Sequence, residues 1–266
     1  MSAEPRVTVV ARSAIAPLFR EPTLRSEQVS QLVLGESACV EEARGEWRRV
    51  TAVHDGYDAW MHAGYVVEMA AEAAERWRED ARGWSLGATV RLAGQHLRLP
   101  LRARVAIEPD GVRLPDGRRG ALVDGLLPDA DDAAAAARAC APERWALTHF
   151  SGAPYGWGGV TPWGVDCSGL VQTTFAARGI FLPRDSALQV ERGAPVDPVA
   201  LCPGDLLFFR GEETARITHV AFAGEADTLV HSTVSCGGVL EEPWRPGTRA
   251  APLRERLVAV RRLVNR

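Results

Sequence analysis

Cys167, His219 and His231 are the residues of this chain whose types and spacing could do chemistry. Cys167 follows a glycine-rich stretch and opens a run in which apolar residues recur at helical spacing as far as Gly179. The pattern predicts a helix with Cys167 in its first turn, where free N–H groups and the helix dipole favour an anion. We therefore expect a nucleophilic thiolate, with a pKa lowered from about 8.5 to neutral or below.

The two histidines belong to segments with a strand pattern, residues 217–223 and 228–232, on either side of a short turn. If Ala223 pairs with Asp227 around a three-residue loop, His219 faces His231 directly on one side of an antiparallel pair. One imidazole can then act as base toward Cys167 while the other holds its tautomer. This is a Cys-His-His form of the nucleophile, base and orienter arrangement.

Composition excludes several classes of function. The chain has 266 residues, a net charge of −3 and a pI of about 6.1, so neither nucleic acid nor an anionic membrane is expected as a partner. Its five cysteines are odd in number and widely spaced, which argues against a disulfide framework. No signal-peptide pattern and no 18-residue apolar stretch are visible, so we expect a cytoplasmic protein.

The chain divides by pattern into three regions. Residues 1–69 read as short strands punctuated by glycines, which favours a small SH3-like β-barrel. Residues 70–128 read as a helical connector, 70–82, and a second, degenerate barrel with turns at Pro109-Asp110-Gly111 and Pro115-Asp116-Gly117. Residues 129–266 begin with an alanine-rich helix to about His149 and continue into an α+β, papain-like layout, in which the nucleophile helix packs on an antiparallel sheet.

The motifs of the last region resemble the NlpC-type family of papain-like cell-wall peptidases. The amino-terminal half looks like the bacterial SH3-like barrels of one branch of that family. The resemblance implies a γ-D-glutamyl-L-diamino-acid endopeptidase without a cofactor or metal, acting on peptidoglycan (murein) stem peptides with a free N-terminal L-alanine. The matching stretches are Tyr155-Gly156-Trp157-Gly158-Gly159, Asp166-Cys167-Ser168-Gly169-Leu170, Leu182-Pro183-Arg184-Asp185-Ser186 with Gln189, Cys202-Pro203-Gly204-Asp205, His219-Val220-Ala221 and His231-Ser232.

The resemblance also assigns roles by position. Cys167 would be the nucleophile, His219 the general base and later acid, and His231 the orienter, with Tyr155 close to the thiol and the developing oxyanion. A pocket for the substrate's ammonium would be shared between the first barrel and the catalytic region. Its candidate residues are Tyr57, Glu27 (with Glu21 and Glu36 as alternatives), Asp166, Ser168, Asp185 and Ser186.

Such a pocket would accept only peptides already stripped from the glycan, which fits recycling of wall fragments inside the cell. Arg184 is expected to make a structural ion pair or backbone contacts. Three other interpretations stay open: an amidase or acyltransferase that uses the same thiol, a zinc site built from Cys167, His219 and His231, and a non-catalytic module that binds wall peptides. The sequence does not reveal the diamino acid or the oligomeric state.

Overall fold

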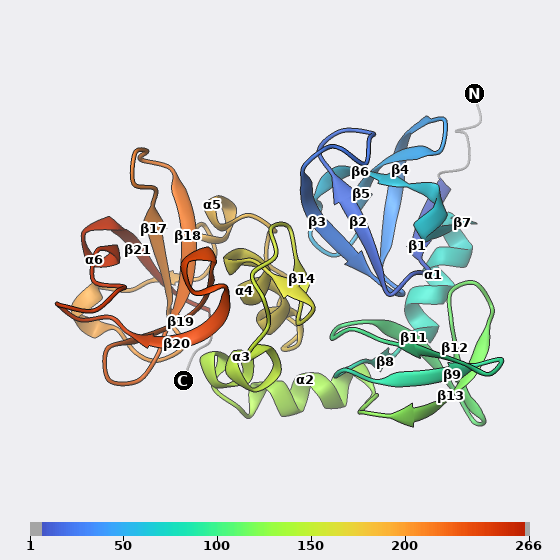
Figure 1. Ribbon diagram of the computed structural model, residues 1–266. Coiled ribbons are helices and arrows are strands. Elements are labelled where there is room, and N and C mark those ends of the chain that lie inside the picture. Colours follow the sequence, from blue (N-terminus) through green and yellow to red (C-terminus); the bar gives the residue numbers. More distant parts are fainter. Residues whose placement is uncertain (1–6, 264–266) are drawn as a thin grey trace. The chain divides into compact units, whose positions relative to one another are not determined.

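The computed structural model describes residues 7–263. The chain forms two compact units, the first extending to Ala133 and the second beginning at Ala134 (Figure 1). No helix within the described range is long and apolar enough to cross a membrane.

The first unit opens with a seven-stranded antiparallel sheet of strand order β3-β2-β6-β5-β4-β1-β7. Val9, Leu18, Leu32 and Met61 belong to its buried core. The short strands predicted for residues 1–69 are present, and one of them, β2, contains Pro17, which cannot donate to the strand ladder. The elements are β1 (Val7–Ala11), β2 (Ile15–Phe19), β3 (Gln28–Val33), β4 (Ser37–Arg44), β5 (Trp47–Ala52), β6 (Asp58–His62), the 3-10 helix η1 (Ala63–Tyr65) and β7 (Val66–Ala70).

A six-stranded sheet of order β10-β9-β13-β12-β11-β8 follows in the same unit. Both predicted turns are present: Glu108 pairs with Gly111 across the first, and the Gly117 N–H donates to the Leu114 carbonyl in the second. The strands are β8 (Gly83–Trp84), β9 (Thr89–Leu92), β10 (Gln95–Arg98), β11 (Arg104–Glu108), β12 (Gly111–Arg113) and β13 (Arg119–Asp124).

Helix α1 (Ala71–Asp80) connects the two sheets, as predicted. Its Trp77 is buried and donates its indole N–H to the Gly35 carbonyl of the first sheet at 2.8 Å. Glu36 of that region pairs with Arg102, which precedes β11, at 2.7 Å, and both side chains are buried. The two sheets of this unit are therefore tied together by a helix and a buried ion pair.

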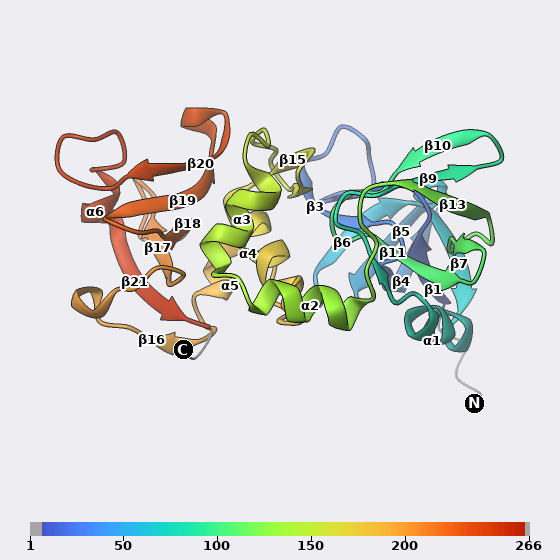
Figure 2. The ribbon, with the colours of Figure 1, turned by 90° about the horizontal axis from the view of Figure 1, so that it is seen from below.

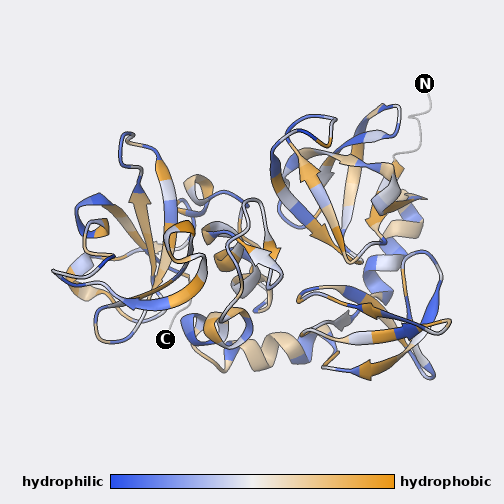
Figure 3. Ribbon diagram, in the orientation of Figure 1, coloured by the Kyte–Doolittle hydropathy of each residue, from blue (hydrophilic) through white to orange (hydrophobic). Residues whose placement is uncertain are grey.

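The second unit is built on a six-stranded antiparallel sheet of order β16-β21-β17-β18-β19-β20. Hydrophobic residues run along its central strands and along helix α4 (Figure 3). Helices α3 and α4 lie side by side, and α4 packs against β18 and β19 (Figures 1 and 2). The strands are β14 (Val160–Thr161), β15 (Gly164–Val165), β16 (Ala194–Pro195), β17 (Leu206–Arg210), β18 (Ile217–Ala223), β19 (Thr228–Thr233), β20 (Gly238–Pro243) and β21 (Leu257–Arg262).

The alanine-rich segment forms two helices rather than the single predicted one. Pro142 is the reason, because a proline favours the first position of a new helix and holds the preceding residue, Ala141, in an extended conformation. The helices are α2 (Ala130–Arg138), α3 (Pro142–Phe150), α4 (Cys167–Ala176), α5 (Ser186–Gln189), α6 (Leu253–Arg256) and the 3-10 helices η2 (Pro198–Ala200) and η3 (Val234–Cys236).

Candidate active site

Cys167 is the first residue of α4, as the sequence predicts. The preceding Asp166 caps the helix: its carboxylate accepts from the Gly169 N–H at 2.8 Å and from the Gly158 N–H at 2.9 Å. Arg184, which is 2% exposed, pairs with Asp166 at 2.6 Å and donates to the Ser168 hydroxyl oxygen at 2.8 Å. Asp166 and Ser168 thus bond within the protein, and the structural ion pair expected of Arg184 is confirmed.

Glycines let the backbone approach the start of α4. A Cβ atom added to Gly169 would lie 2.1 Å from the Gly159 carbonyl oxygen, and one added to Gly159 would lie 2.2 Å from that of Gly164. Such distances are shorter than any real contact of a Cβ atom, so any larger residue would force the backbone apart. The glycine-rich stretch seen in the sequence therefore lets the backbone pack closely against the start of the nucleophile helix.

The thiol lies in a buried environment, since Cys167 is 9% exposed. Burial, together with the charge of Asp166, raises the pKa of Cys167 to about 12, although the backbone N–H groups of Val220 and Ser168 favour the thiolate. The expectation of a lowered pKa is therefore wrong for the resting site: loss of hydration outweighs the helix N-terminus. The hydrogen bond from the Val220 N–H to the Cys167 sulfur also holds β18 close to the thiol. Val220 directly follows His219 on this strand.

The two histidines form one hydrogen-bonded chain. His219 Nε2 lies 2.8 Å from His231 Nδ1, and both rings belong to the second unit. Burial, aided by His231 and by nearby arginines, lowers the pKa of His219 to about 3. Burial therefore disfavours a lone charge on His219 as it does on the thiol.

The strand pairing that brings the histidines together differs from the predicted one. Ala223 pairs with Leu229 rather than Asp227, which shifts the register by two residues. The cause is a turn in which Ala226 and Asp227 both adopt left-handed conformations, with φ of 50° and 58°. An even shift leaves every side chain on its original face. The histidines therefore still share a face and meet diagonally instead of directly.

Sequence reasoning missed Glu242 of β20. Its carboxylate Oε1 lies 2.7 Å from His231 Nε2 and also accepts from Arg249, and its side chain is 9% exposed. The hydrogen-bonded chain therefore runs from His219 through His231 to this carboxylate. A signal was present: β20 pairs with β19 so that Leu240 faces His231, and a residue two positions along lies on the same face. This signal can be used only once the pairing of β19 with β20 is known.

Tyr155 lies near the thiol, as the resemblance implies. Burial and the nearby Cys167 and Asp166 raise the pKa of the Tyr155 phenol above its usual range. Its backbone is fixed by a bridge to Val165 and by an N–H bond to the Gly237 carbonyl at 2.8 Å. A neutral phenol beside the sulfur can donate a hydrogen bond to a developing oxyanion.

Asp185 and Ser186 follow Arg184 at the start of α5. Asp185 is exposed, and Ser186 is buried. Gln189 of the same helix is fully buried and donates to the carbonyls of Ser168 at 3.0 Å and Pro183 at 2.9 Å. These bonds hold the segment beside the nucleophile helix. The substrate contacts expected of Asp185 and Ser186 stay predictions.

Tyr57 and Glu27 belong to the first unit. Tyr57 is partly buried against the core of the first sheet, and its N–H donates to the Asp55 carboxylate at 3.0 Å. Glu27 forms an ion pair with Arg20 at 2.8 Å. Their predicted part in a pocket shared between the two units stays a prediction.

The zinc interpretation does not fit the arrangement of donors. His219 and His231 each direct one ring nitrogen at the other, and the second nitrogen of His231 bonds to Glu242. Both nitrogens of His231 are therefore engaged away from the thiol. Within residues 7–263, no group of three or more His, Cys, Asp or Glu side chains is arranged to hold a metal ion.

Comparison with known proteins covers both units. Residues 152–252 match the NlpC/P60 family, and residues 18–64 match the bacterial dipeptidyl-peptidase SH3 domain. A curated relative, the gamma-D-glutamyl-L-lysine dipeptidyl-peptidase of Bacillus cereus (strain ATCC 10987 / NRS 248), is 29% identical over 234 residues, which cover 76% of this chain and 66% of the relative. The probable endopeptidase NlpC of Escherichia coli (strain K12) is 37% identical over 92 residues, covering 34% of this chain and 60% of that protein.

The fold has a solved counterpart. The crystal structure of an NlpC/P60 family protein from Bacillus cereus ATCC 10987 superposes with a TM-score of 0.74 at 21% sequence identity, covering 97% of this chain and all of that one. The match over residues 152–252 contains Cys167, His219 and His231 together. The chain therefore carries a domain of the NlpC/P60 cysteine peptidase family, preceded by a bacterial dipeptidyl-peptidase SH3 domain.

Proposed function

We propose that this protein is a cysteine endopeptidase that hydrolyses the γ-D-glutamyl–L-diamino-acid bond of peptidoglycan stem peptides bearing a free N-terminal L-alanine. The observation that carries the proposal is the hydrogen-bonded chain from His219 through His231 to Glu242, beside a thiol at the start of α4. The SH3 match and the dipeptidyl-peptidase relative support the substrate class.

The carboxylate of Glu242 determines which ring nitrogen of His231 and of His219 carries a proton. An ionised carboxylate only accepts hydrogen bonds, so His231 carries its proton on Nε2 and offers the lone pair of Nδ1. His219 then donates from Nε2, which leaves its Nδ1 as the base. The nitrogen available to Cys167 is therefore unprotonated in the resting enzyme, which is the state that general-base catalysis requires.

Acylation follows from this arrangement. As the sulfur of Cys167 attacks the γ-carbonyl carbon of D-glutamate, its proton passes to His219 Nδ1 and a C–S bond forms. The free N–H of Cys167, the first helical residue, and the Tyr155 hydroxyl can donate to the oxyanion. His219 then protonates the amine of the diamino acid, and the C–N bond breaks. Water, deprotonated by His219, hydrolyses the thioester and restores the thiol.

The substrate's ammonium would be bound by the predicted residues of the second unit, Asp166, Ser168, Asp185 and Ser186. Such a pocket requires acceptors shielded from water, and leaving them unpaired costs several kcal/mol. Because an intact glycan strand acylates that amine, only released peptides would fit. We therefore propose a role in recycling wall fragments in the cytoplasm.

The test is hydrolysis of L-Ala-γ-D-Glu-diamino-acid tripeptide and its N-acetylated form, with products identified by mass. We expect release of L-Ala-γ-D-Glu from the free peptide, a kcat/KM roughly 10³-fold lower for the acetylated form, and no product with Cys167→Ala. Equal cleavage of both forms would refute the ammonium pocket. Cleavage of other amides or transfer to an added amine, without this peptide reaction, would favour the amidase or acyltransferase alternative.

A further inference from the structure

A cavity of about 200 Å³ lies beside the two histidines within the second unit. Its polar lining comes from His219, His231, Thr233, Ser235, Arg249 and Arg256. The volume is below the range of about 300–1,000 Å³ that suits drug-sized ligands. A cavity of this size suits part of one amino-acid residue.

Its position follows from the proposed function, on which this inference rests. His219 must contact the leaving amine in order to protonate it. His219 lies in the wall of the cavity, and we place the cavity on the side of the leaving group, where the diamino acid is released.

The charge of the cavity is positive. Arg249 donates to the Glu242 carboxylate and the Ser235 hydroxyl but is 41% exposed, and a guanidinium has further donors. Arg256 is half-buried and forms no ion pair with any of residues 7–263. The described residues that line the cavity include no aspartate or glutamate. Both arginines also disfavour a charge on His219.

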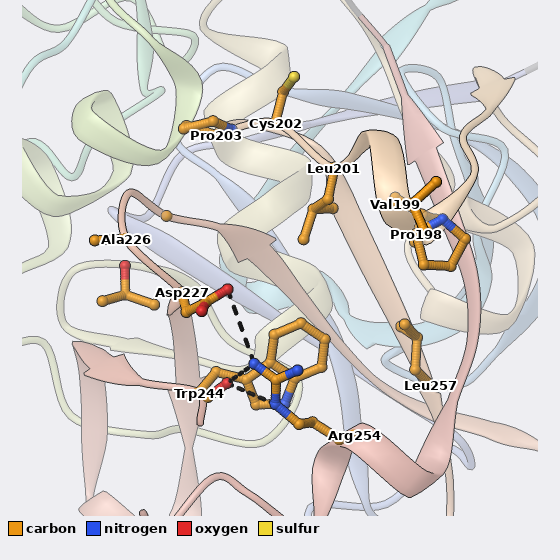
Figure 4. A pocket seen from close by; sticks show the side chains of 13 residues that line it. Pro198, Val199, Leu201, Cys202, Pro203, Ala226, Asp227, Trp244, Arg254 and Leu257 are labelled. Carbon is orange, nitrogen blue, oxygen red and sulfur yellow. Dashed lines mark hydrogen bonds and ion pairs between the residues drawn. The ribbon is translucent and has the colours of Figure 1, made fainter. Parts of the chain in front are cut away.

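A second cavity, of about 420 Å³, provides a contrast (Figure 4). It too contains an arginine, Arg254, but that guanidinium donates to the Trp244 carbonyl, lies 4.5 Å from the centre of the Trp244 ring and is 3.8 Å from the Asp227 carboxylate. Its charge is compensated within the protein. The cavity beside the histidines holds an arginine without such compensation.

We propose that the cavity beside His219 and His231 binds a carboxylate of the leaving diamino-acid residue, with Arg256 as its principal partner. Arginine binds carboxylates through two parallel hydrogen bonds, which fixes orientation as well as charge. The carboxylate could be the α-carboxylate of a terminal residue or one at the end of the side chain, as in 2,6-diaminopimelate. A lysine side chain would bring an ammonium toward two arginines.

The experiment compares four peptides that share L-Ala-γ-D-Glu. The third residue is lysine, lysine amide, diaminopimelate, or diaminopimelate amidated on its side-chain carboxyl. Each is assayed with the parent enzyme, with Arg256→Gln, and with Arg245→Gln, which removes the same charge from an exposed residue outside the cavity.

We expect the parent enzyme to favour peptides with the recognised carboxylate by roughly tenfold to a hundredfold in kcat/KM, the scale of a charge-assisted hydrogen bond. Arg256→Gln should abolish this preference, mainly through KM, and Arg245→Gln should keep it. A loss only between the lysine peptides identifies the α-carboxylate, and a loss only between the diaminopimelate peptides identifies the side chain. A preference that survives Arg256→Gln, or an equal fall for all four peptides, overturns the proposal.

Failure of the proposed function has a different signature. If no peptide is cleaved, that function is refuted, and the cavity is tested by calorimetric titration of diaminopimelate and lysine into Cys167→Ala. Selective binding of diaminopimelate that disappears on adding Arg256→Gln supports the carboxylate site. Binding of neither compound, or equal binding with and without Arg256, refutes it.

Discussion

At the scale of single residues, the carboxylate at the end of the hydrogen-bonded chain determines which nitrogen of His219 is a base. Glu242→Gln keeps the size but allows an amide N–H to donate to His231 Nε2. Both histidines would then change tautomer, and His219 would carry its proton on Nδ1. We expect kcat to fall roughly 10²-fold with little change in KM, the scale of general-base catalysis.

Glu241→Gln is the matched control. This neighbouring residue bonds to Thr228 at 2.7 Å and to Arg144 at 3.4 Å. Steady-state kinetics of the two variants as a function of pH provide the measurement. If Glu242→Gln were as active as Glu241→Gln, the carboxylate would have no part in orienting the histidines.

At the scale of elements, the position of α4 depends on close contacts between its backbone and that of the preceding loop. Gly169→Ala would push a methyl group against the Gly159 carbonyl, whereas Gly164→Ala meets only ordinary contact, at 3.7 Å from the Gly156 Cα atom. We expect Gly169→Ala to destabilise the protein by roughly 1–3 kcal/mol and to reduce activity, while Gly164→Ala leaves both nearly unchanged. Chemical denaturation and the peptide assay measure the two effects. Equal stability of the two variants would contradict the close approach.

Local elements such as the start of α4 can be predicted from the sequence more readily than the pairing of strands. The start of α4 was predictable because Asp166 is a capping residue followed at once by helical periodicity. The pairing of β18 with β19 was not, since two non-glycine residues, Ala226 and Asp227, adopt left-handed conformations that composition does not signal. Glu242 was missed for a related reason: its place beside His231 depends on a tertiary pairing of strands rather than on any local pattern.

At the scale of the whole molecule, buried histidines make stability depend on pH. The folded state lowers the pKa of His219 from 6.5 to about 3, so between these values the unfolded chain binds more protons and stability falls as pH falls. The loss is at most about 1.4 kcal/mol per pH unit for one group. His149, whose pKa is also lowered by burial, acts in the same direction, and Glu143, whose pKa is raised, acts in the opposite one.

The measurement is the unfolding midpoint from pH 7 to pH 4 for the parent protein and for His219→Gln. The variant should show a shallower decline, because one of the titrating groups has been removed while His149 and Glu143 remain. Comparing slopes rather than midpoints separates the titration from any general effect of the substitution. Parallel slopes would mean that His219 is not held neutral by the fold.

The glycine contacts around α4 also determine how such a site can change over evolution or in the laboratory. Where backbone meets backbone, no neighbouring side chain can be trimmed to make room, so a substitution there has no simple compensating partner. Trp157 and Trp163, in the same stretch of chain, are 60% and 40% exposed and present their side chains to solvent. Variation in specificity is therefore expected to accumulate at these tryptophans, while Gly159 and Gly169 stay constant across any library selected for activity.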